Sequence, residues 1–196
     1  TGNTHPGFMG WVHGGGSVPG MLAEMLAAGL NANLGGRDHM PIEVERQITR
    51  WLSQLFEFPG TATGLFVTGT SMANLLGVLI ASRRVLGLDV RRNGVAAGHK
   101  HLVAYASAAA HGCIAQAMDL SGLGTAALRV IPLNDRHQID LAELKTAIAQ
   151  DRAAGLTPFV VVGTAGAVDT GAIDDLAALA AIARKEELWF HVDGAI

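Results

Sequence analysis

Cysteine, aromatic residues and charged residues are all scarce in this sequence of 196 residues. The single cysteine, Cys113, cannot form an intramolecular disulfide bond, which favours a reducing compartment such as the cytoplasm. Charged residues make up 16% of the chain, the formal net charge is -3, and no run of Lys or Arg occurs. The sequence therefore lacks the basic surface that binds nucleic acids or anionic membranes. No apolar stretch reaches the roughly 18 to 20 uncharged residues of a membrane span. We expect a soluble, cytoplasmic protein whose partners are small metabolites, with no nucleic acid and no membrane among them.

Hydrophobic residues, by contrast, make up 49% of the chain, which is enough for a buried core. From about residue 61 onward, short apolar runs alternate with longer helical patterns rich in Ala and Leu. The runs predict strands covered on both faces, because they are nearly continuously apolar: Gly64–Thr68, Leu102–Ala106, Ala127–Ile131, Pro158–Gly163 and Leu188–Val192. The helical patterns are Ser71–Gly87, Ala110–Leu120, Asp140–Ala154 and Asp174–Glu187. This alternation predicts an α/β domain over residues 61–196, with a mainly parallel sheet and crossover helices.

Residues 1–60 form a different segment, in which helical patterns cover Pro19–Asn33 and Pro41–Phe56. The second pattern carries an apolar stripe at helical spacing, formed by Ile48, Trp51, Leu52, Leu55 and Phe56. Such a stripe needs a covering surface, which the same domain or another subunit could supply. We expect an N-terminal helical segment that precedes the α/β domain.

The segment Gly69–Thr70–Ser71 lies where a strand is predicted to end and a helix to begin. Gly69 lets the backbone approach a ligand closely, and two hydroxyl groups stand beside the free N–H groups of the helix start. This arrangement suits a phosphate group. An ordinary helix N-cap explains the same residues, because Ser and Thr are favoured at that position.

Three further polar residues follow predicted strands. His111 could stack on a planar ring or transfer protons near neutral pH, although a lone histidine more often only forms hydrogen bonds with backbone groups. Thr164 lies in a loop of small residues that leaves room for a flat ligand, or that is a plain turn. Asp193 ends an apolar strand, where a buried carboxylate needs a partner such as a protonated ring nitrogen. Cys113 has no visible partner and is expected to be a packing residue.

Taken in order, these segments resemble the group II pyridoxal-phosphate decarboxylases, which act on aromatic L-amino acids, glutamate, cysteine sulfinate or histidine. The resemblance covers essentially the whole chain. The segments that carry it are His5–Phe8, Pro19–Glu24, Pro41–Glu45, Val67–Asn74, Ala110–His111 and His191–Ala195. It implies that residues 61–196 are the large domain of a fold type I pyridoxal-phosphate enzyme, incomplete at its C-terminus.

The same resemblance implies a role for each site residue. Gly69, Thr70 and Ser71 would hold the cofactor phosphate, and His111 would stack on the pyridine ring and assist proton movement. Thr164 would contact an oxygen on the ring. Asp193 would pair with the pyridine nitrogen, which keeps the ring protonated as an electron sink, and Ala195 would lie against the opposite ring face. No metal ion is expected.

Substrate, partner and catalytic lysine are also implied by the resemblance. Trp11 and His13 would line the substrate pocket, and the turn Asn33–Gly35 would reach the partner's site in a homodimer with shared active sites. Trp11 favours an aromatic L-amino acid, which would be decarboxylated to the amine; an acidic amino acid or another lyase reaction remains open. The lysine that forms the Schiff base would lie beyond Ile196, so Lys100 is a decoy and this segment alone is expected to be inactive. A nucleotide-binding α/β module without this cofactor is the alternative of another class.

Overall fold

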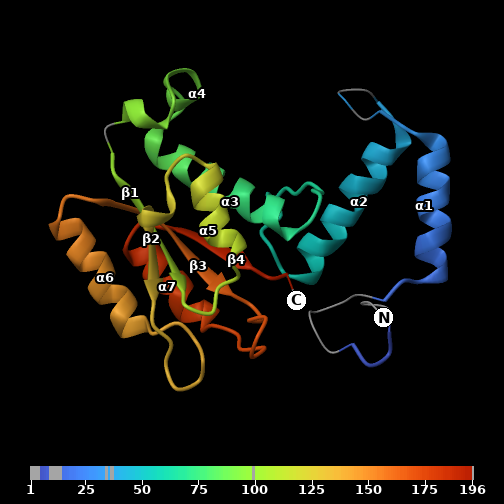
Figure 1. Ribbon diagram of the computed structural model, residues 1–196. Coiled ribbons are helices and arrows are strands. Elements are labelled where there is room, and N and C mark those ends of the chain that lie inside the picture. The colour runs from blue at the N-terminus through green and yellow to red at the C-terminus, as the bar shows by residue number, and fades with distance from the viewer. Residues whose placement is uncertain (1–4, 9–14, 34, 36–37, 99, 196) are drawn as a thin grey trace. The chain divides into compact units, whose positions relative to one another are not determined.

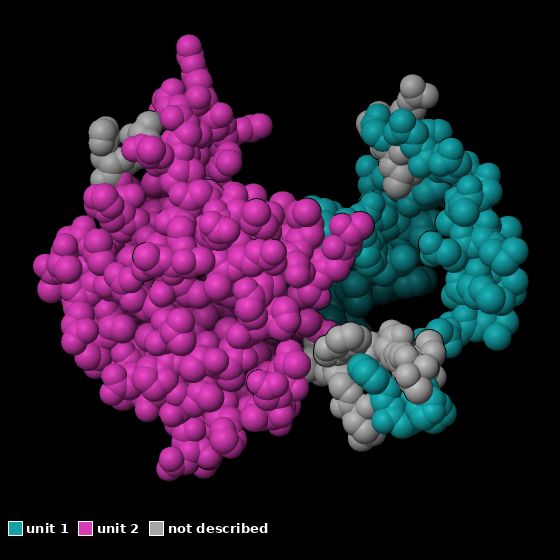
Figure 2. Space-filling view, in the orientation of Figure 1, with its two compact units in different colours: residues 1–67 teal, residues 68–196 magenta. Residues whose placement is uncertain are grey.

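The computed structural model describes residues 5–8, 15–33, 35, 38–98 and 100–195. The chain divides into two compact units, residues 1–67 and residues 68–196 (Figure 2).

The second unit is built on a parallel sheet of four strands (Figure 1). These are β1 (Leu102–Ser107), β2 (Leu128–Ile131), β3 (Thr157–Thr164) and β4 (Trp189–Asp193), in the spatial order β2-β1-β3-β4. All three pairings are parallel, and β3 and β4 pair from Val160 opposite Trp189 to Thr164 opposite Asp193. The predicted α/β fold with a mainly parallel sheet is confirmed.

Helices cover both faces of this sheet (Figure 1). On one face, α3 (Thr70–Leu86) and α5 (Cys113–Leu120) pack on alternate residues of the strands, such as Ala104 and Val162. On the other face, α6 (Leu141–Ala153) and α7 (Leu176–Lys185) pack on the residues between them, such as Tyr105 and Val161. Two cores result, which explains why β1 is buried along its whole length and reads as a continuous apolar run. The connections also contain the short helices α4 (Val90–Asn93), η1 (Val95–Gly98) and η2 (Thr125–Ala127).

Aspartate side chains cap two of these helices. Asp140 accepts hydrogen bonds from the backbone N–H groups of Ala142 and Glu143, and so caps α6. Asp175 accepts a hydrogen bond from Ala178 N and caps α7. Because a carboxylate satisfies N–H groups that lack helical partners, both helices begin within two residues of the predicted starts.

The strand predicted over Gly64–Thr68 is wrong. Residues 62–67 have no regular secondary structure, and Leu65 and Phe66 are exposed. A strand requires a neighbouring strand for its backbone hydrogen bonds, and the four strands of the described sheet lie entirely within residues 102–193. An apolar run can meet the composition of a strand without having that neighbour.

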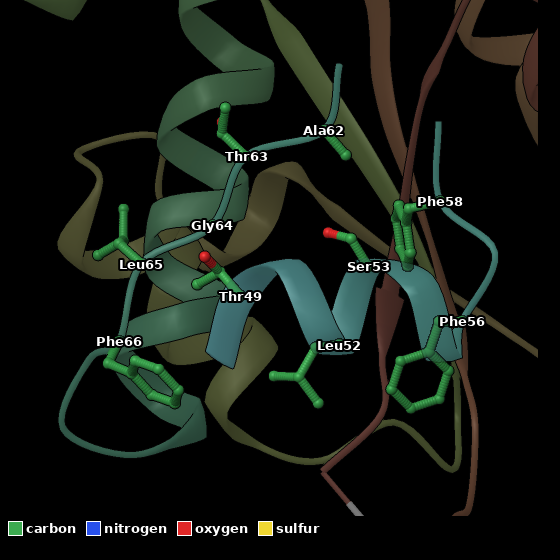
Figure 3. A pocket seen from close by; sticks show the side chains of 10 residues that line it. All are labelled: Thr49, Leu52, Ser53, Phe56, Phe58, Ala62, Thr63, Gly64, Leu65 and Phe66. Carbon is green, nitrogen blue, oxygen red and sulfur yellow. The ribbon is translucent and has the colours of Figure 1, made fainter. Parts of the chain in front are cut away.

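The described residues of the first unit form two helices, α1 (Val18–Leu30) and α2 (Met40–Leu55), neither of which buries a residue. The apolar stripe of α2 is present but largely exposed, with Trp51, Leu55 and Phe56 on the surface. Between α2 and the segment 58–66 lies a cavity of about 200 Å³ (Figure 3). Its lining is mostly apolar: Thr49, Leu52, Ser53, Phe56, Phe58, Ala62, Thr63, Gly64, Leu65 and Phe66. Within the described ranges, no helix has both the length and the apolar character to cross a membrane.

Candidate active site

The predicted site residues of the second unit gather at one edge of the sheet. Because all strands are parallel, their carboxyl ends share this edge, and the segments that lead into α5 and α7 begin there. Asp193 ends β4, Thr164 ends β3, and His111 lies between the end of β1 and the start of α5. Ligands of open α/β sheets bind at this edge.

Thr164 and Asp193 are the most distinctive pair. They lie opposite each other in the β3–β4 register, so their side chains emerge on the same face of the sheet. Thr164 is 5% exposed and Asp193 is 6% exposed. Thr164 Oγ1 and Asp193 Oδ1 are the buried side-chain oxygens without a hydrogen-bond partner in the described part of the chain. Each such unpaired group costs about 1–3 kcal/mol of stability. A ligand that forms hydrogen bonds with both oxygens would offset this cost.

Asp174 fastens Thr164 in this position. Its Oδ2 accepts from Thr164 N at 2.8 Å and its Oδ1 accepts from Ile139 N at 2.7 Å. Asp174 N in turn donates to the Thr164 carbonyl at 2.9 Å. The sequence indicated only that Asp174 lies near a helix start, and its role in holding the Thr164 backbone was missed because its partners are remote in sequence.

The start of α3 is open. Gly69 occupies the N-cap position with φ 82°, a left-handed conformation that glycine adopts without strain, and no side chain of the described residues caps the helix. Gly69, Thr70 and Ser71 are all exposed. The explanation of this segment as an ordinary Ser or Thr N-cap is therefore wrong. The first N–H groups of a 17-residue helix face outward, where helix geometry favours an anion.

His111 is exposed, and its Nδ1 accepts a hydrogen bond from Cys113 N at 3.2 Å. Cys113 itself is buried in the core. Burial raises the pKa of its thiol, and the nearby Asp193 carboxylate raises it further, against the opposing effect of a hydrogen bond from Asn74. The thiol therefore stays protonated at neutral pH, and Cys113 serves as a packing residue, as expected.

Two polar residues beside this edge were not identified from the sequence. Asn74, in the first turns of α3, is 2% exposed. Its Oδ1 accepts from His191 Nε2 at 2.7 Å, and its Nδ2 donates to Cys113 Sγ at 3.1 Å. Burial lowers the pKa of His191 from its ordinary value of 6.5, although the Asp193 carboxylate opposes this shift. His191 is thus neutral at pH 7 and carries its proton on Nε2.

The remaining predicted residues are distributed as follows. Ala195 follows β4 and is exposed. Trp11 and His13, predicted to line the substrate pocket, lie outside the described residues, and so does Leu34 of the predicted turn. Lys100 precedes β1, at the amino edge of the sheet, and its ammonium group donates to the Val85 carbonyl at 3.0 Å. This position is opposite to the carboxyl edge that holds Asp193, in agreement with its interpretation as a decoy.

The geometry suits one kind of ligand in particular. An anionic group could bind at the open start of α3, and a ring that carries a protonated nitrogen and a hydrogen-bonding oxygen could satisfy Asp193 and Thr164. Pyridoxal phosphate has these three features. The buried oxygens without partners therefore fit the cofactor that the sequence resemblance implied.

Comparison with known proteins supports the same conclusion. A model of the pyridoxal-dependent decarboxylase conserved domain matches residues 1–196. The chain is 32% identical to an aromatic-L-amino-acid decarboxylase of Bacillus atrophaeus over 194 residues, which cover 97% of this chain and 38% of that protein. It is also 32% identical over 193 residues to an L-2,4-diaminobutyrate decarboxylase of Rhizobium meliloti (strain 1021), covering 97% of this chain and 37% of that protein.

Among solved structures, the glutamate decarboxylase domain of a diaminobutyrate-pyruvate transaminase and L-2,4-diaminobutyrate decarboxylase from Vibrio parahaemolyticus superimposes with a TM-score of 0.91. That match has 31% sequence identity and covers 99% of this chain and 43% of that chain. The chain thus spans less than half the length of these relatives. The predicted fold, family and cofactor are confirmed, which sets aside a nucleotide-binding module without pyridoxal phosphate. By its sequence match and its fold, the chain belongs to the pyridoxal-dependent decarboxylase family.

Proposed function

We propose that the complete protein decarboxylates an L-amino acid with pyridoxal phosphate, and that the carboxyl edge of the sheet is its cofactor site. One observation carries the proposal: Thr164 Oγ1 and Asp193 Oδ1 are buried side by side, and neither has a partner among the described residues. Folding leaves such groups unpaired only at some cost, and a bound ligand would remove that cost.

Asp193 would hold a proton on the pyridine nitrogen. The carboxylate lies in a buried site, where an opposite charge interacts more strongly than in water. When bound, pyridoxal phosphate supplies a protonated ring that accepts the electron pair left behind as carbon dioxide departs. Asp193 would keep that ring protonated, and Thr164 Oγ1 would hydrogen-bond to the ring oxygen and fix the ring orientation.

The other site residues would contact the phosphate group and the two faces of the cofactor ring. Gly69, Thr70 and Ser71 would bind the phosphate with the open N–H groups of α3 and two hydroxyl groups. His111, which is exposed beside the start of α5, would stack on the ring and assist proton transfer near the substrate carboxylate. Ala195 would lie against the other face of the ring, where a small side chain leaves room for it.

The cofactor assignment is tested by Asp193→Asn in the complete protein. This variant keeps the shape of the side chain but removes the charge, so we expect a large loss of decarboxylation and a weaker affinity for pyridoxal phosphate. Asp119→Asn is the matched control, since Asp119 is an exposed residue of α5 away from this edge. The absorption of bound cofactor and its loss on borohydride treatment report binding. A protein that remains colourless with added pyridoxal phosphate, or an Asp193→Asn variant with wild-type activity, would refute the assignment.

For the substrate, we propose an aromatic L-amino acid. The support is Trp11, which the family resemblance assigns to the substrate pocket together with His13, and the similarity to the Bacillus atrophaeus enzyme. The equal similarity to an L-2,4-diaminobutyrate decarboxylase makes a substrate with a charged side chain the competing choice.

Release of carbon dioxide from a panel of L-amino acids tests this choice. The panel contains phenylalanine, tyrosine, tryptophan, glutamate and 2,4-diaminobutyrate at equal concentrations. We expect the highest kcat/KM with an aromatic member and a selective loss of that activity in Trp11→Ala. A preference for glutamate or 2,4-diaminobutyrate would overturn the aromatic assignment while leaving the decarboxylase proposal intact.

We further propose that the protein is a homodimer with shared active sites, to which residues 1–60 contribute. The support is the exposed apolar surface of the first unit, where α1 presents Met25, Leu26 and Leu30 and α2 presents Trp51 and Leu55. Surfaces of this kind mark interaction sites. Sedimentation of the complete protein should give the mass of a dimer, and Leu26→Glu should shift it toward the monomer. A monomeric wild-type protein with full activity would refute this proposal.

A further inference from the structure

A single buried carboxamide connects three of the elements that would hold the cofactor. Asn74 lies on α3, three residues after Ser71 of the proposed phosphate site. Its Nδ2 donates to Cys113 Sγ on α5 at 3.1 Å, and its Oδ1 accepts from His191 Nε2 on β4 at 2.7 Å. The Asn74 side chain is therefore a junction of α3, α5 and β4.

Each partner of Asn74 is a near neighbour of a proposed cofactor contact. His191 precedes Asp193 by two residues, and alternate residues of a strand share one face, so both side chains emerge toward α3 and α5. Cys113 follows His111 by two residues, and its backbone N–H donates to the His111 ring at 3.2 Å. A displacement of Asn74 would thus be transmitted to His111 on one side and to Asp193 on the other.

His191 is also confined by the backbone of α3. A Cβ atom added at Gly77 would lie 2.6 Å from His191 Cε1 and 2.7 Å from its Nδ1. The imidazole ring therefore rests directly against the helix, where any other residue at position 77 would displace it. With Nε2 bound to Asn74, the ring is restrained by both a hydrogen bond and a steric contact.

We propose that Asn74 is a positioning residue for the cofactor site, whose two hydrogen bonds fix the phosphate-binding start of α3, His111 and Asp193 relative to one another. This inference rests on the proposed function. Apolar contacts between helices and strands tolerate small shifts, whereas hydrogen bonds of defined length and direction do not. A ligand that contacts all three elements at once is sensitive to such shifts, because the contacts act together only in one arrangement.

The test uses Asn74→Leu in the complete protein, a change of similar size that removes both hydrogen bonds. We expect the Kd of the apoprotein for pyridoxal phosphate to rise by about tenfold or more. A loss of binding free energy equal to that of one hydrogen bond corresponds to this change in Kd. Inorganic phosphate would bind at the start of α3 alone, so its inhibition constant against cofactor binding should change by less than about twofold. This difference separates a loss of relative positioning from local unfolding of α3.

Two histidine variants and one control complete the design. His191→Gln retains an N–H donor toward Asn74 and should keep the cofactor Kd within about threefold of wild type, whereas His191→Leu should resemble Asn74→Leu. If Asn74→Leu does not fold, the comparison of the cofactor Kd between His191→Gln and His191→Leu tests the positioning role instead. Ser82→Ala is the matched control, because Ser82 is a buried polar residue of the same helix whose hydroxyl group, among the described residues, bonds only to the Leu79 carbonyl. It should lower the unfolding temperature without changing the Kd.

Three results would overturn the inference: a wild-type Kd in Asn74→Leu, an equal rise of the Kd in Ser82→Ala, or equal effects of the Gln and Leu substitutions at His191. A wild-type protein that does not bind pyridoxal phosphate at all would instead refute the proposed function, and the positioning role would be refuted with it.

Discussion

Asp174→Asn should destabilise the second unit far more than the same change at the adjacent Asp175. Asp174 is 5% exposed, and its two carboxylate oxygens accept from Ile139 N and Thr164 N at 2.7 and 2.8 Å. An asparagine side chain has one oxygen that can accept and an NH₂ group that cannot. One of the two backbone N–H groups would therefore face another donor and remain unpaired.

The magnitude follows from these two bonds. A buried donor without a partner costs about 1–3 kcal/mol, and the surviving bond loses about 1 kcal/mol because it no longer involves a charge. The expected loss is about 2–4 kcal/mol, a large part of the roughly 5–15 kcal/mol that stabilises a typical domain. Asp175 is an exposed N-cap that accepts from Ala178 N at 2.9 Å. Because Asn caps helices as well as Asp does, Asp175→Asn should change stability by less than about 0.5 kcal/mol.

Urea unfolding of the complete protein, followed by far-ultraviolet circular dichroism without cofactor, measures both variants. Asp174→Asn should also weaken binding of pyridoxal phosphate, because Asp174 holds the backbone of Thr164. Equal losses of stability in the two variants, or a loss below about 1 kcal/mol in Asp174→Asn, would refute the role assigned to the buried carboxylate.

Two further outcomes follow from buried polar groups. Tyr105→Phe removes the 2.8 Å hydrogen bond from Tyr105 Oη to Asp151 Oδ2 and should cost about 1.5–3 kcal/mol in urea unfolding, with cofactor affinity unchanged; a neutral effect would contradict it. Burial lowers the pKa of His191 below 6.5, so from pH 6.5 downward the unfolded chain binds a proton that the folded chain does not. Stability should therefore fall with decreasing pH, at a rate of up to about 1.4 kcal/mol per unit. His191→Gln should show a shallower fall between pH 7.5 and 5.5, and identical slopes would contradict the assignment.

The sheet and its helices could be predicted because their signals are local. Residues 102–106 of β1 are apolar, which is typical of a strand covered on both faces, and Asp140 and Asp175 cap α6 and α7 close to their predicted starts. The segment Gly64–Thr68 has a similar local signal but no strand beside it in the described structure. Strand pairing joins residues that are distant in sequence, and a single sequence does not contain that information.

The same distinction separates the predicted site residues from the missed ones. Thr164 and Asp193 could be identified because each is a polar residue directly at the end of an apolar run. Asp174 and Asn74 could not, because what makes them important is their partners. Asp174 binds Ile139 N, 35 residues away, and Asn74 binds His191, 117 residues away. Each looks like an ordinary polar residue near a helix start until the fold brings its partner close.

The distribution of satisfied and unsatisfied groups indicates where this fold is adapted to a ligand. Asp174, Asn74 and Asp151 are buried, and each makes at least two hydrogen bonds. Thr164 Oγ1 and Asp193 Oδ1 are equally buried but remain unpaired within the described residues. General packing defects would scatter such groups through the core, whereas these two lie opposite each other at the carboxyl edge, beside groups that hold their backbones in place. A ligand that pairs with both binds only the folded chain, so it stabilises the fold by an amount that grows with its concentration relative to its Kd. The free-energy cost of the two unpaired oxygens thus arises at the carboxyl edge of the sheet, where hydrogen bonds to the cofactor would offset it.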